Sequence, residues 1–380
     1  MSDMYRVCSR CVMDTSDPDI FFDEQGVCNH CHLYGELEAK YCHQGAVGKR
    51  LLAETVDRIR ADGRGRSYDC LIGVSGGVDS TYVAYLVKQA GLRPLAVHVD
   101  NGWNSELAVK NIENVLTHLG IDLYTQVLDW DTFRDLQLAF LRASVPDAEI
   151  PTDHAIGGVL YRMAAKHGLR HIISGSNIVT EGMLPARWVY GVADWSYIRA
   201  IHAQFGTRPL RNFPHYSLTD LAWYTGVRRI RSFRILDYVP YVKADAMHTL
   251  QTELGWKNYG GKHHESIYTR FFQGYILPRK FNIDKRRSHL STLICAGQLS
   301  REEASAELTT SPYPEALQAE DREYVLKKFS LSSQEFDAIM TAPVKSYRDY
   351  PNHQVRRDQV KHLLDKVRLL GLVRRFVQSW

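Results

Sequence analysis

The stretch LIGVSGGVDS, residues 71–80, passes within a few positions from apolar residues into small and hydroxyl-bearing ones. Residues 69–74 have the continuous apolar character of a strand buried in a parallel sheet. The segment TYVAYLVKQAG that follows repeats apolar residues at helical spacing. Glycines let an anion approach backbone N–H groups, and a helix N-terminus adds partial positive charge. The stretch therefore predicts a strand, a phosphate-binding loop and a helix.

The loop is not the common phosphate loop with the pattern GxxxxGK[ST], because it has no lysine and carries an aspartate. A carboxylate beside a polyphosphate is useful when it holds Mg²⁺, since hard cations prefer oxygen ligands. An ordinary tight turn between strand and helix would explain two glycines, but not the whole SGGxDS pattern. We expect Asp79 to hold Mg²⁺ and four residues to contact phosphates, namely Ser75, Gly76, Gly77 and Ser80.

Further strands and helices alternate along the chain after the loop. Residues 94–100, 123–128 and 172–174 are expected to be strands, and residues 105–119 and 155–167 helices. This alternation predicts an α/β fold with a doubly wound, mostly parallel sheet. Ligands of such sheets bind at the carboxyl ends of the strands, where the loop after residue 74 would lie.

SGGVDS resembles the PP-loop of the ATP pyrophosphatase superfamily. The resemblance implies an adenine nucleotide alpha hydrolase-like fold and cleavage of ATP between its α and β phosphates, giving AMP and diphosphate. It also implies adenine contacts from Val99 and Asp100, a nucleotide contact from Gly175, and a phosphate contact from Lys243. Glu181 is either a ligand of magnesium or of the acceptor, or a first-turn helix acid favoured by the helix dipole.

Two cysteine pairs near the start of the chain predict a metal site. Two residues separate the cysteines of each pair, and sixteen separate the pairs, which is typical of a zinc ribbon formed by Cys8, Cys11, Cys28 and Cys31. Four thiolates suit zinc better than an iron–sulfur cluster and leave no position open for water. We expect a structural site; a redox or sulfur-carrying role is the alternative. His30, His32 and Cys42 are either surface residues or substitute ligands.

Residues 255–304 concentrate charged side chains and histidines among aromatic residues. The motif YGGKHHES does not have the spacing of an amphipathic helix and predicts a glycine turn that presents cations and a carboxylate to a ligand. Lys243 and Lys262 are candidate cations for the transition state. His263, His264 and Glu265 are candidates for orienting a substrate or accepting a proton, and each histidine is equally expected to be structural.

The head CSRCVMDTSDPDIFFDEQGVCNHC and the block GGKHHES…TRFFQ…DKRR, on either side of the PP-loop, are similar to the N-acetyl sugar amidotransferases of bacterial surface polysaccharide (LPS O-antigen) biosynthesis. The resemblance implies that an acetamido group of a nucleotide-linked sugar becomes an acetamidino group through an adenylated intermediate. It also implies that ammonia comes from a separate glutaminase subunit with a cyclase-like companion. Cys70 and Cys295 fit core positions better than a glutaminase nucleophile.

The composition sets limits on these expectations. The 380 residues carry a net charge of +4, which argues weakly against a nucleic-acid partner. No apolar run approaches the roughly 18 residues of a membrane span, and the start lacks a signal-peptide core, so we expect a cytoplasmic protein. We expect a zinc-ribbon-like module with four cysteine ligands (1–45), a PP-loop ATP-binding domain (46–245) and a substrate-binding and helical C-terminal region (246–380).

Two other functions fit parts of this pattern. A PP-loop enzyme that modifies tRNA, by thiolation or lysidine-type ligation, would also use SGGVDS and can carry cysteine pairs. A zinc-dependent scaffold that only senses ATP would need no acceptor. The end of the chain, VKHLLDKVRLLGLVRRFVQSW, is amphipathic and basic, and is either a packed helix or a helix for a membrane surface or a partner.

Overall fold

A five-stranded sheet forms the centre of the protein. The computed structural model describes residues 5–261, 264–355 and 357–358. The strands are all parallel and lie in the order β3-β2-β1-β4-β5. Their bounds are β1 Cys70–Gly73, β2 Pro94–Asp100, β3 Asp122–Val127, β4 His171–Ser174 and β5 Arg231–Arg234.

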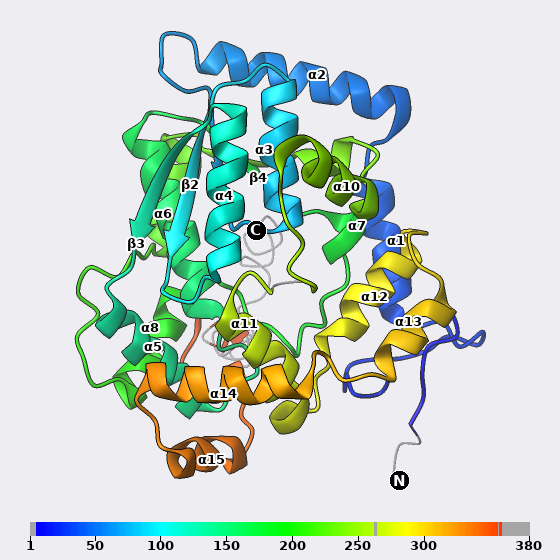
Figure 1. The fold of residues 1–380 in the computed structure, drawn as a ribbon, viewed down its shortest axis with the longest axis vertical. Helices are drawn as coiled ribbons and strands as arrows, with labels where there is room; N and C mark the ends of the chain where they lie inside the picture. Colours follow the sequence, from blue (N-terminus) through cyan, green and yellow to red (C-terminus); the bar gives the residue numbers. More distant parts are fainter. Residues whose placement is uncertain (1–4, 262–263, 356, 359–380) are drawn as a thin grey trace, which may run out of the picture.

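Helices cover both faces of the sheet, as Figure 1 shows for α3 and α4 in front and α6 behind. Successive residues of a strand point to opposite faces. Ile72 accordingly packs with Val83 of α3 and Ile112 of α4, whereas Leu71 packs with Val159 of α6. The predicted α/β, doubly wound, parallel sheet is confirmed. The helices around it are α1 Asn29–Tyr41, α2 Gly45–Asp62, α3 Val78–Gln89, α4 Glu106–Leu119, α5 Trp130–Ala143, α6 Ile150–Lys166, α7 Ile178–Glu181, α8 Trp195–Phe205, α9 Leu218–Ala222, η1 Trp223–Val227, η2 Ile235–Tyr238 and α10 Lys243–Leu254.

The strand order reverses between β1 and β4. The chain proceeds from β1 outward through β2 to β3 and then returns to place β4 on the other side of β1. Such a reversal point opens a crevice at the carboxyl edge of the sheet. The loops 74–77 and 175–177, which follow β1 and β4, lie at this point.

Two local features differ from the sequence prediction. The arginine-rich run at residues 228–234, for which no strand was predicted, is largely exposed and contains the edge strand β5. Exposed charged residues such as Arg231 suit an edge, because they discourage pairing with another chain. The helix expected at residues 155–167 instead begins at Ile150. The backbone of Pro151 fits a first helical turn, and the position before the helix is Glu149.

The C-terminal region is helical and lies against the carboxyl ends of the strands, with α14 and α15 along the lower side of Figure 1. The short α11 continues directly into the π-helix η3. Reciprocal capping boxes begin α13 at Ser300 and α15 at Ser332. The bounds are α11 Ile267–Phe271, η3 Phe272–Phe281, α12 Lys285–Cys295, α13 Arg301–Leu308, α14 Glu315–Phe329, α15 Ser333–Thr341 and η4 Tyr347–Asp349. The basic segment 359–380 lies outside the described residues.

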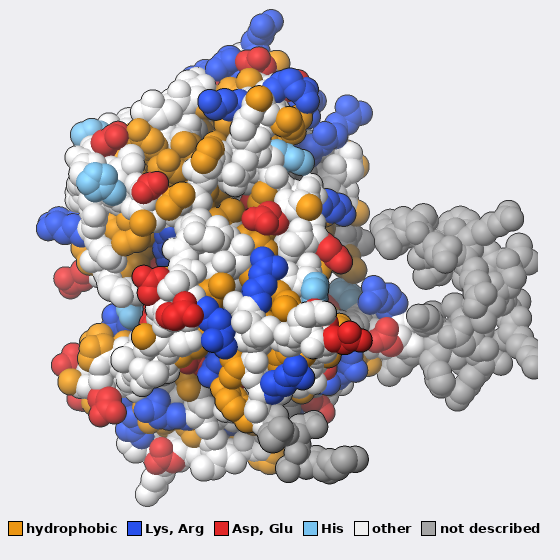
Figure 2. Space-filling model, turned by 90° about the vertical axis from the view of Figure 1, so that its right-hand side faces the viewer, with side chains coloured by type: hydrophobic (Ala, Val, Ile, Leu, Met, Phe, Trp, Pro, Cys, Tyr) orange, Lys and Arg blue, Asp and Glu red, His pale blue; other side chains and the backbone are white. Residues whose placement is uncertain are grey.

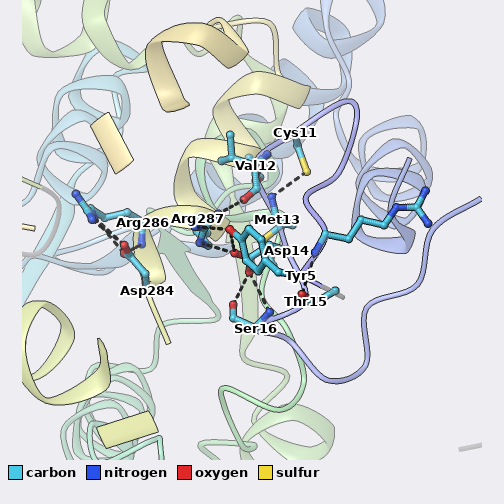
Figure 3. Close-up of polar contacts among 12 residues, drawn as sticks. Tyr5, Cys11, Val12, Met13, Asp14, Thr15, Ser16, Asp284, Arg286 and Arg287 are labelled. Atoms are coloured by element: carbon cyan, nitrogen blue, oxygen red, sulfur yellow. Dashed lines mark hydrogen bonds and ion pairs between the residues drawn. The ribbon is translucent and has the colours of Figure 1, made fainter. Parts of the chain in front are cut away.

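An arginine of α12 connects the cysteine module to this region. Figure 3 shows the Arg287 guanidinium turned toward Asp14, Val12 and Tyr5. Its Nε lies 3.1 Å from Asp14 Oδ2, and its Nη1 donates to the Val12 carbonyl at 2.8 Å. Arg301 of α13 donates to the carbonyls of Cys8 and Cys11. The module is thereby fixed to α12 and α13, while the division at residues 45 and 245 stays a prediction.

None of the helices within the described residues is long and apolar enough to cross a bilayer.

Candidate functional site

The SGGVDS loop leaves the end of β1 in a conformation that requires glycine. Gly76 has φ +84°, and a Cβ there would lie 2.8 Å from the Ala108 carbonyl oxygen. Gly77 occupies the position before α3, and no side chain caps that helix. The hydroxyls of Ser75 and Ser80 lie 3.2 Å apart over the helix start. An uncapped helix N-terminus beside two hydroxyls is suited to phosphate oxygens.

Asp79, in the first turn of α3, receives hydrogen bonds from two hydroxyls. Tyr241 donates to Oδ1, and Thr180 donates to Oδ2 at 3.3 Å. Burial and the charge of Asp79 raise the pKa of Tyr241, so it remains a donor. The sequence indicated neither partner, although Tyr241 lies two residues before the predicted Lys243. These two hydroxyls orient the carboxylate, and carboxylate oxygens are the ligands that Mg²⁺ prefers, which fits the predicted magnesium ligand.

Gly175, after β4, packs directly against the phosphate loop. A Cβ at Gly175 would lie 3.0 Å from Ser80 N and 3.2 Å from the carbonyl carbon of Asp79. The next turn is fixed by Asn177, whose side chain caps α7 by accepting from Thr180 N at 2.8 Å. The glycine therefore allows the two loops to meet; its nucleotide contact stays a prediction.

The loop after β2 borders the same edge. Asp100 Oδ1 accepts from Gly102 N at 2.8 Å and from Asn104 Nδ2 at 3.3 Å, so this carboxylate shapes the turn. Val99 and Asp100 are both half-buried at the end of the strand. Their predicted adenine contacts are not tested by this arrangement.

Segment 256–265 closes over the phosphate loop from a distant part of the chain. Trp256 Nε1 donates to the Gly76 carbonyl at 2.9 Å, and the Tyr259 hydroxyl donates to the same oxygen at 3.2 Å. Glu265 Oε1 lies 3.3 Å from the position that a Cβ of Gly77 would occupy. The predicted site residue Glu265 is therefore brought to the loop, and Trp256 and Tyr259 are contacts that the sequence did not indicate.

Backbone hydrogen bonds hold Glu265 in this place. Ser105 N donates to the Glu265 carbonyl at 2.8 Å, and Asn104 forms a bridge with Ser266. The His264 ring lies 6.0 Å from the ring of Tyr313, edge to face, on the side of the C-terminal helices. Lys243 begins α10, and its backbone N–H donates to Gln298 Oε1 at 3.0 Å. The predicted Lys262 and His263 lie outside the described residues.

Three carboxylates and a lysine form an acid cluster, defined here as Asp147, Glu149, Asp153 and Lys285. Glu149 Oε2 accepts from Gln273 Nε2 at 2.8 Å and lies 3.3 Å from Lys285 Nζ. Burial raises the pKa of Asp147 to about 6. Burial, then the charges of Glu149 and Asp147, raise the pKa of Asp153 to about 8. Asp153 follows Glu149 by one helical turn, and its backbone N–H donates to the Glu149 carbonyl at 3.2 Å. Its side chain is exposed to solvent, which weakens the effect of burial on its pKa.

The four predicted zinc ligands converge at the other end of the molecule. Sγ–Sγ distances are 3.9 Å for Cys8–Cys31 and 3.7 Å for Cys11–Cys28 and Cys28–Cys31, and all four thiols are buried. A tetrahedral ion with metal–sulfur bonds of about 2.3 Å has edges of about 3.8 Å. The site thus fits one zinc ion, whereas a multi-iron cluster would hold the sulfurs farther apart. His30 and His32 instead contact Asp17 and Asp23.

The known proteins that resemble this chain match different parts of it. Residues 265–367 match the family described as the C-terminal domain of WbpG-like LPS biosynthesis proteins. The uncharacterized protein MJ1599 of Methanocaldococcus jannaschii is 25% identical over 331 residues, which cover 84% of this chain and 99% of that protein. The tRNA(Ile)-lysidine synthase of Chlamydia pneumoniae is 37% identical over 71 residues, only 18% of this chain and 22% of that enzyme.

Two solved structures overlap with smaller parts of the fold. NMN synthetase from Francisella tularensis superposes with a TM-score of 0.27 and 19% identity, over 35% of this chain and 57% of that chain. A predicted subunit of a tRNA methyltransferase from Methanocaldococcus jannaschii gives a TM-score of 0.27 and 16% identity, over 47% and 74%.

The parallel sheet carries the SGGVDS loop at its reversal point, and residues 265–367, which begin at Glu265, match the WbpG-like C-terminal family. The chain is thus similar to WbpG-like LPS biosynthesis proteins in its C-terminal region.

Proposed function

We propose that the protein is an ATP-dependent amidotransferase that converts an acetamido group of a nucleotide-linked sugar to an acetamidino group, for a bacterial surface polysaccharide. The contact of Glu265 with the phosphate loop carries this proposal, because Glu265 is the first residue of the WbpG-like match. The region similar to LPS biosynthesis proteins and the nucleotide loop therefore contribute to one site.

The reaction explains why a phosphate loop and an acceptor region must meet. An amide oxygen is a poor leaving group, and ammonia does not displace it unaided. Attack of that oxygen on the α phosphate of ATP would release diphosphate and leave AMP on the carbon. Ammonia would then displace AMP. Holding the amide oxygen in line with the α phosphate, away from water, is the main task of the protein.

The candidate residues divide between the two reactants. Backbone N–H groups and hydroxyls of residues 75–80 would bind phosphates, and Asp79 would hold Mg²⁺, which would neutralise phosphate charge. Lys243 and Lys262 would stabilise the departing diphosphate. His263, His264 and Glu265 would orient the sugar or move a proton.

Ammonia is proposed to come from a separate glutaminase subunit with a cyclase-like companion. A glutaminase of the cysteine type needs a thiolate. Burial raises the pKa of the Cys70 thiol, and burial with the charges of Asp237 and Glu38 raises that of Cys42 to about 11. Cys295 lies 3.7 Å from Cys31 of the metal site. Cys70 and Cys42 are therefore poor nucleophiles for glutamine, and Cys295 lies beside the metal site, which supports a partner subunit.

The test is incubation with ATP, Mg²⁺, ammonium chloride and a panel of UDP- and CMP-linked acetamido sugars. We expect AMP and diphosphate with one sugar class, and a product lighter by the difference between an oxygen atom and an NH group. ADP as the product, or AMP formation independent of every sugar, would reject the proposal. Glutamine should replace ammonium only after the partner glutaminase is added.

A tRNA-modifying enzyme is the second candidate, favoured by the local similarity to tRNA(Ile)-lysidine synthase. On the face drawn in Figure 2, Lys and Arg side chains are interspersed with Asp and Glu side chains. A phosphate backbone is usually bound by a more uniform basic surface. Filter binding of tRNA, measured beside the sugar assay, separates the two functions.

A further inference from the structure

A buried hydroxyl beside the acid cluster has no hydrogen-bond partner among the described residues. The Tyr268 side chain is 2% exposed, and its hydroxyl is unpaired. Burial, and then the charges of Glu149 and Asp147, raise its pKa, which places the hydroxyl within the field of these carboxylates. A buried polar group without a partner costs free energy, so the position is suited to a bound polar ligand.

The cluster is short of positive charge. Three carboxylates face one lysine, and the lysine side chain and Glu149 are each only 13% exposed. The raised pKa of Asp153 reflects the same imbalance, because taking up a proton relieves it. The donors already on Glu149 are N–H groups, from Gln273 and Lys285. Carboxylate and phenol oxygens arranged for N–H donors suit a small nitrogen cation.

The cluster lies at the carboxyl edge of the sheet, beside the phosphate loop. Asn101 Nδ2, in the loop after β2, donates to Thr152 Oγ1 in the first turn of α6 at 3.2 Å. The charge of Glu181 raises the pKa of both Asp153 and Tyr241, and Tyr241 is bonded to Asp79. The charge of Glu181 thus acts both on the cluster and on a residue that holds Asp79.

We propose that Asp153, Glu149 and Tyr268 form an ammonium-binding subsite that supplies the nitrogen nucleophile. This proposal rests on the proposed amidotransferase function. Asp153 takes a proton from ammonium: an N–H bond breaks, an O–H bond forms, and the electron pair stays on nitrogen. That pair forms the C–N bond, and the C–O bond to AMP breaks with its electrons on AMP. A second proton leaves nitrogen for solvent, and the product is an amidinium.

Binding can be tested without any activity. The melting temperature of the full chain is measured at pH 8.5 in ammonium chloride and in sodium chloride of equal ionic strength, and crystals are soaked in rubidium chloride as an ammonium substitute. We expect stabilisation specific to ammonium, and anomalous density against the carboxylates of Glu149 and Asp153. Asp153→Asn should abolish both signals, and Asp131→Asn, on the exposed surface of α5, should abolish neither. Equal melting temperatures in both salts, or rubidium density only elsewhere, would overturn the subsite.

Activity then separates the subsite from the adenylation site. Asp153→Asn, Glu149→Gln and Tyr268→Phe should leave sugar-dependent diphosphate release within about twofold of wild type and raise the KM for ammonium by about tenfold or more. Loss of diphosphate release with an unchanged ammonium KM would assign the cluster to sugar or nucleotide and refute the subsite. Absence of diphosphate release in wild type with every sugar would refute the proposed function, while the salt and rubidium experiments still decide ammonium binding.

Discussion

The phosphate loop and the acid cluster lie at the same edge of the sheet and are built in opposite ways. The loop consists of glycines and hydroxyls within six consecutive positions, and it offers backbone N–H groups. The cluster consists of ionisable side chains from α6, α12 and the chain before α6, and it offers oxygen atoms. The loop can bind an anion through its backbone, whereas the cluster would bind a cation through side chains from several elements. The difference suggests separate binding of the two reactants.

Gly76→Ala should disrupt the phosphate loop and leave the acid cluster intact, and it has the largest expected effect. Both the φ of +84° and the approach of the Ala108 carbonyl exclude a Cβ. We expect AMP formation to fall about 100-fold or more, while the ammonium response of the melting temperature is retained. The matched control is Gly120→Ala, at φ +58° with nothing within 4 Å of its Cβ. A fully active Gly76→Ala enzyme would contradict the role of the loop.

Cys11→Ser should disturb the acid cluster indirectly, because it removes a ligand of the metal site. The module is fixed to α12 through Arg287, and Lys285 lies on the same helix. We expect loss of zinc, a melting temperature lower by about 5–10 °C, and a larger rise in the KM for ammonium than in that for ATP. Metal content by mass spectrometry and both KM values check this result. Cys70→Ser, in the core of the sheet, would also destabilise the fold but should retain zinc.

Tyr241→Phe tests whether the phosphate loop and the acid cluster function separately. The substitution removes one of the two hydroxyl donors on Asp79 and keeps the ring. We expect kcat to fall about tenfold, with a higher Mg²⁺ requirement and an unchanged ammonium KM. Tyr82→Phe, whose ring lies 5.7 Å from that of Tyr241, is the control. An ammonium effect in Tyr241→Phe would mean that the regions are not separate.

Asp153→Asn should have the smallest effect, a gain in stability that depends on pH. The folded pKa is raised from 3.8 to about 8, so the folded chain binds more protons than the unfolded chain between these values. Wild-type stability therefore falls as pH rises through this window. Asparagine removes the charge that the other carboxylates repel. Because the Asp153 side chain is exposed, solvent screening reduces the gain, and we expect Asp153→Asn to melt only about 2 °C above wild type at pH 8.5.

The stability difference should be much smaller at pH 5, near the lower end of this window, and should vanish only below the ordinary pKa of 3.8. The other charged groups that act on this carboxyl are Glu149, Asp147, Lys285 and Glu181. Melting curves at the two pH values, in sodium chloride, provide the measurement. A variant that is equally stabilised at both would show that Asp153 is ionised throughout.

The sequence predicted correctly those features whose residues are close together in the chain. Four strands, the phosphate loop and the cysteine pairs follow from local pattern and spacing, and Glu265 was indicated because YGGKHHES breaks helical spacing. Strand β5 was missed because exposed arginines mask an edge strand. Tyr241, Trp256 and the acid cluster were missed because their role exists only after segments far apart in the sequence meet. Asp153 in particular reads as an ordinary helix-start acid until Glu149 and Lys285 are placed beside it.

The Gly76 carbonyl accepts hydrogen bonds from two aromatic side chains that belong to the segment leading into the WbpG-like domain. Under the proposed function, displacement of that segment by an acceptor would move the turn that is proposed to bind the nucleotide. Cleavage of ATP would then wait for a sugar, and the cell would be protected from futile nucleotide consumption.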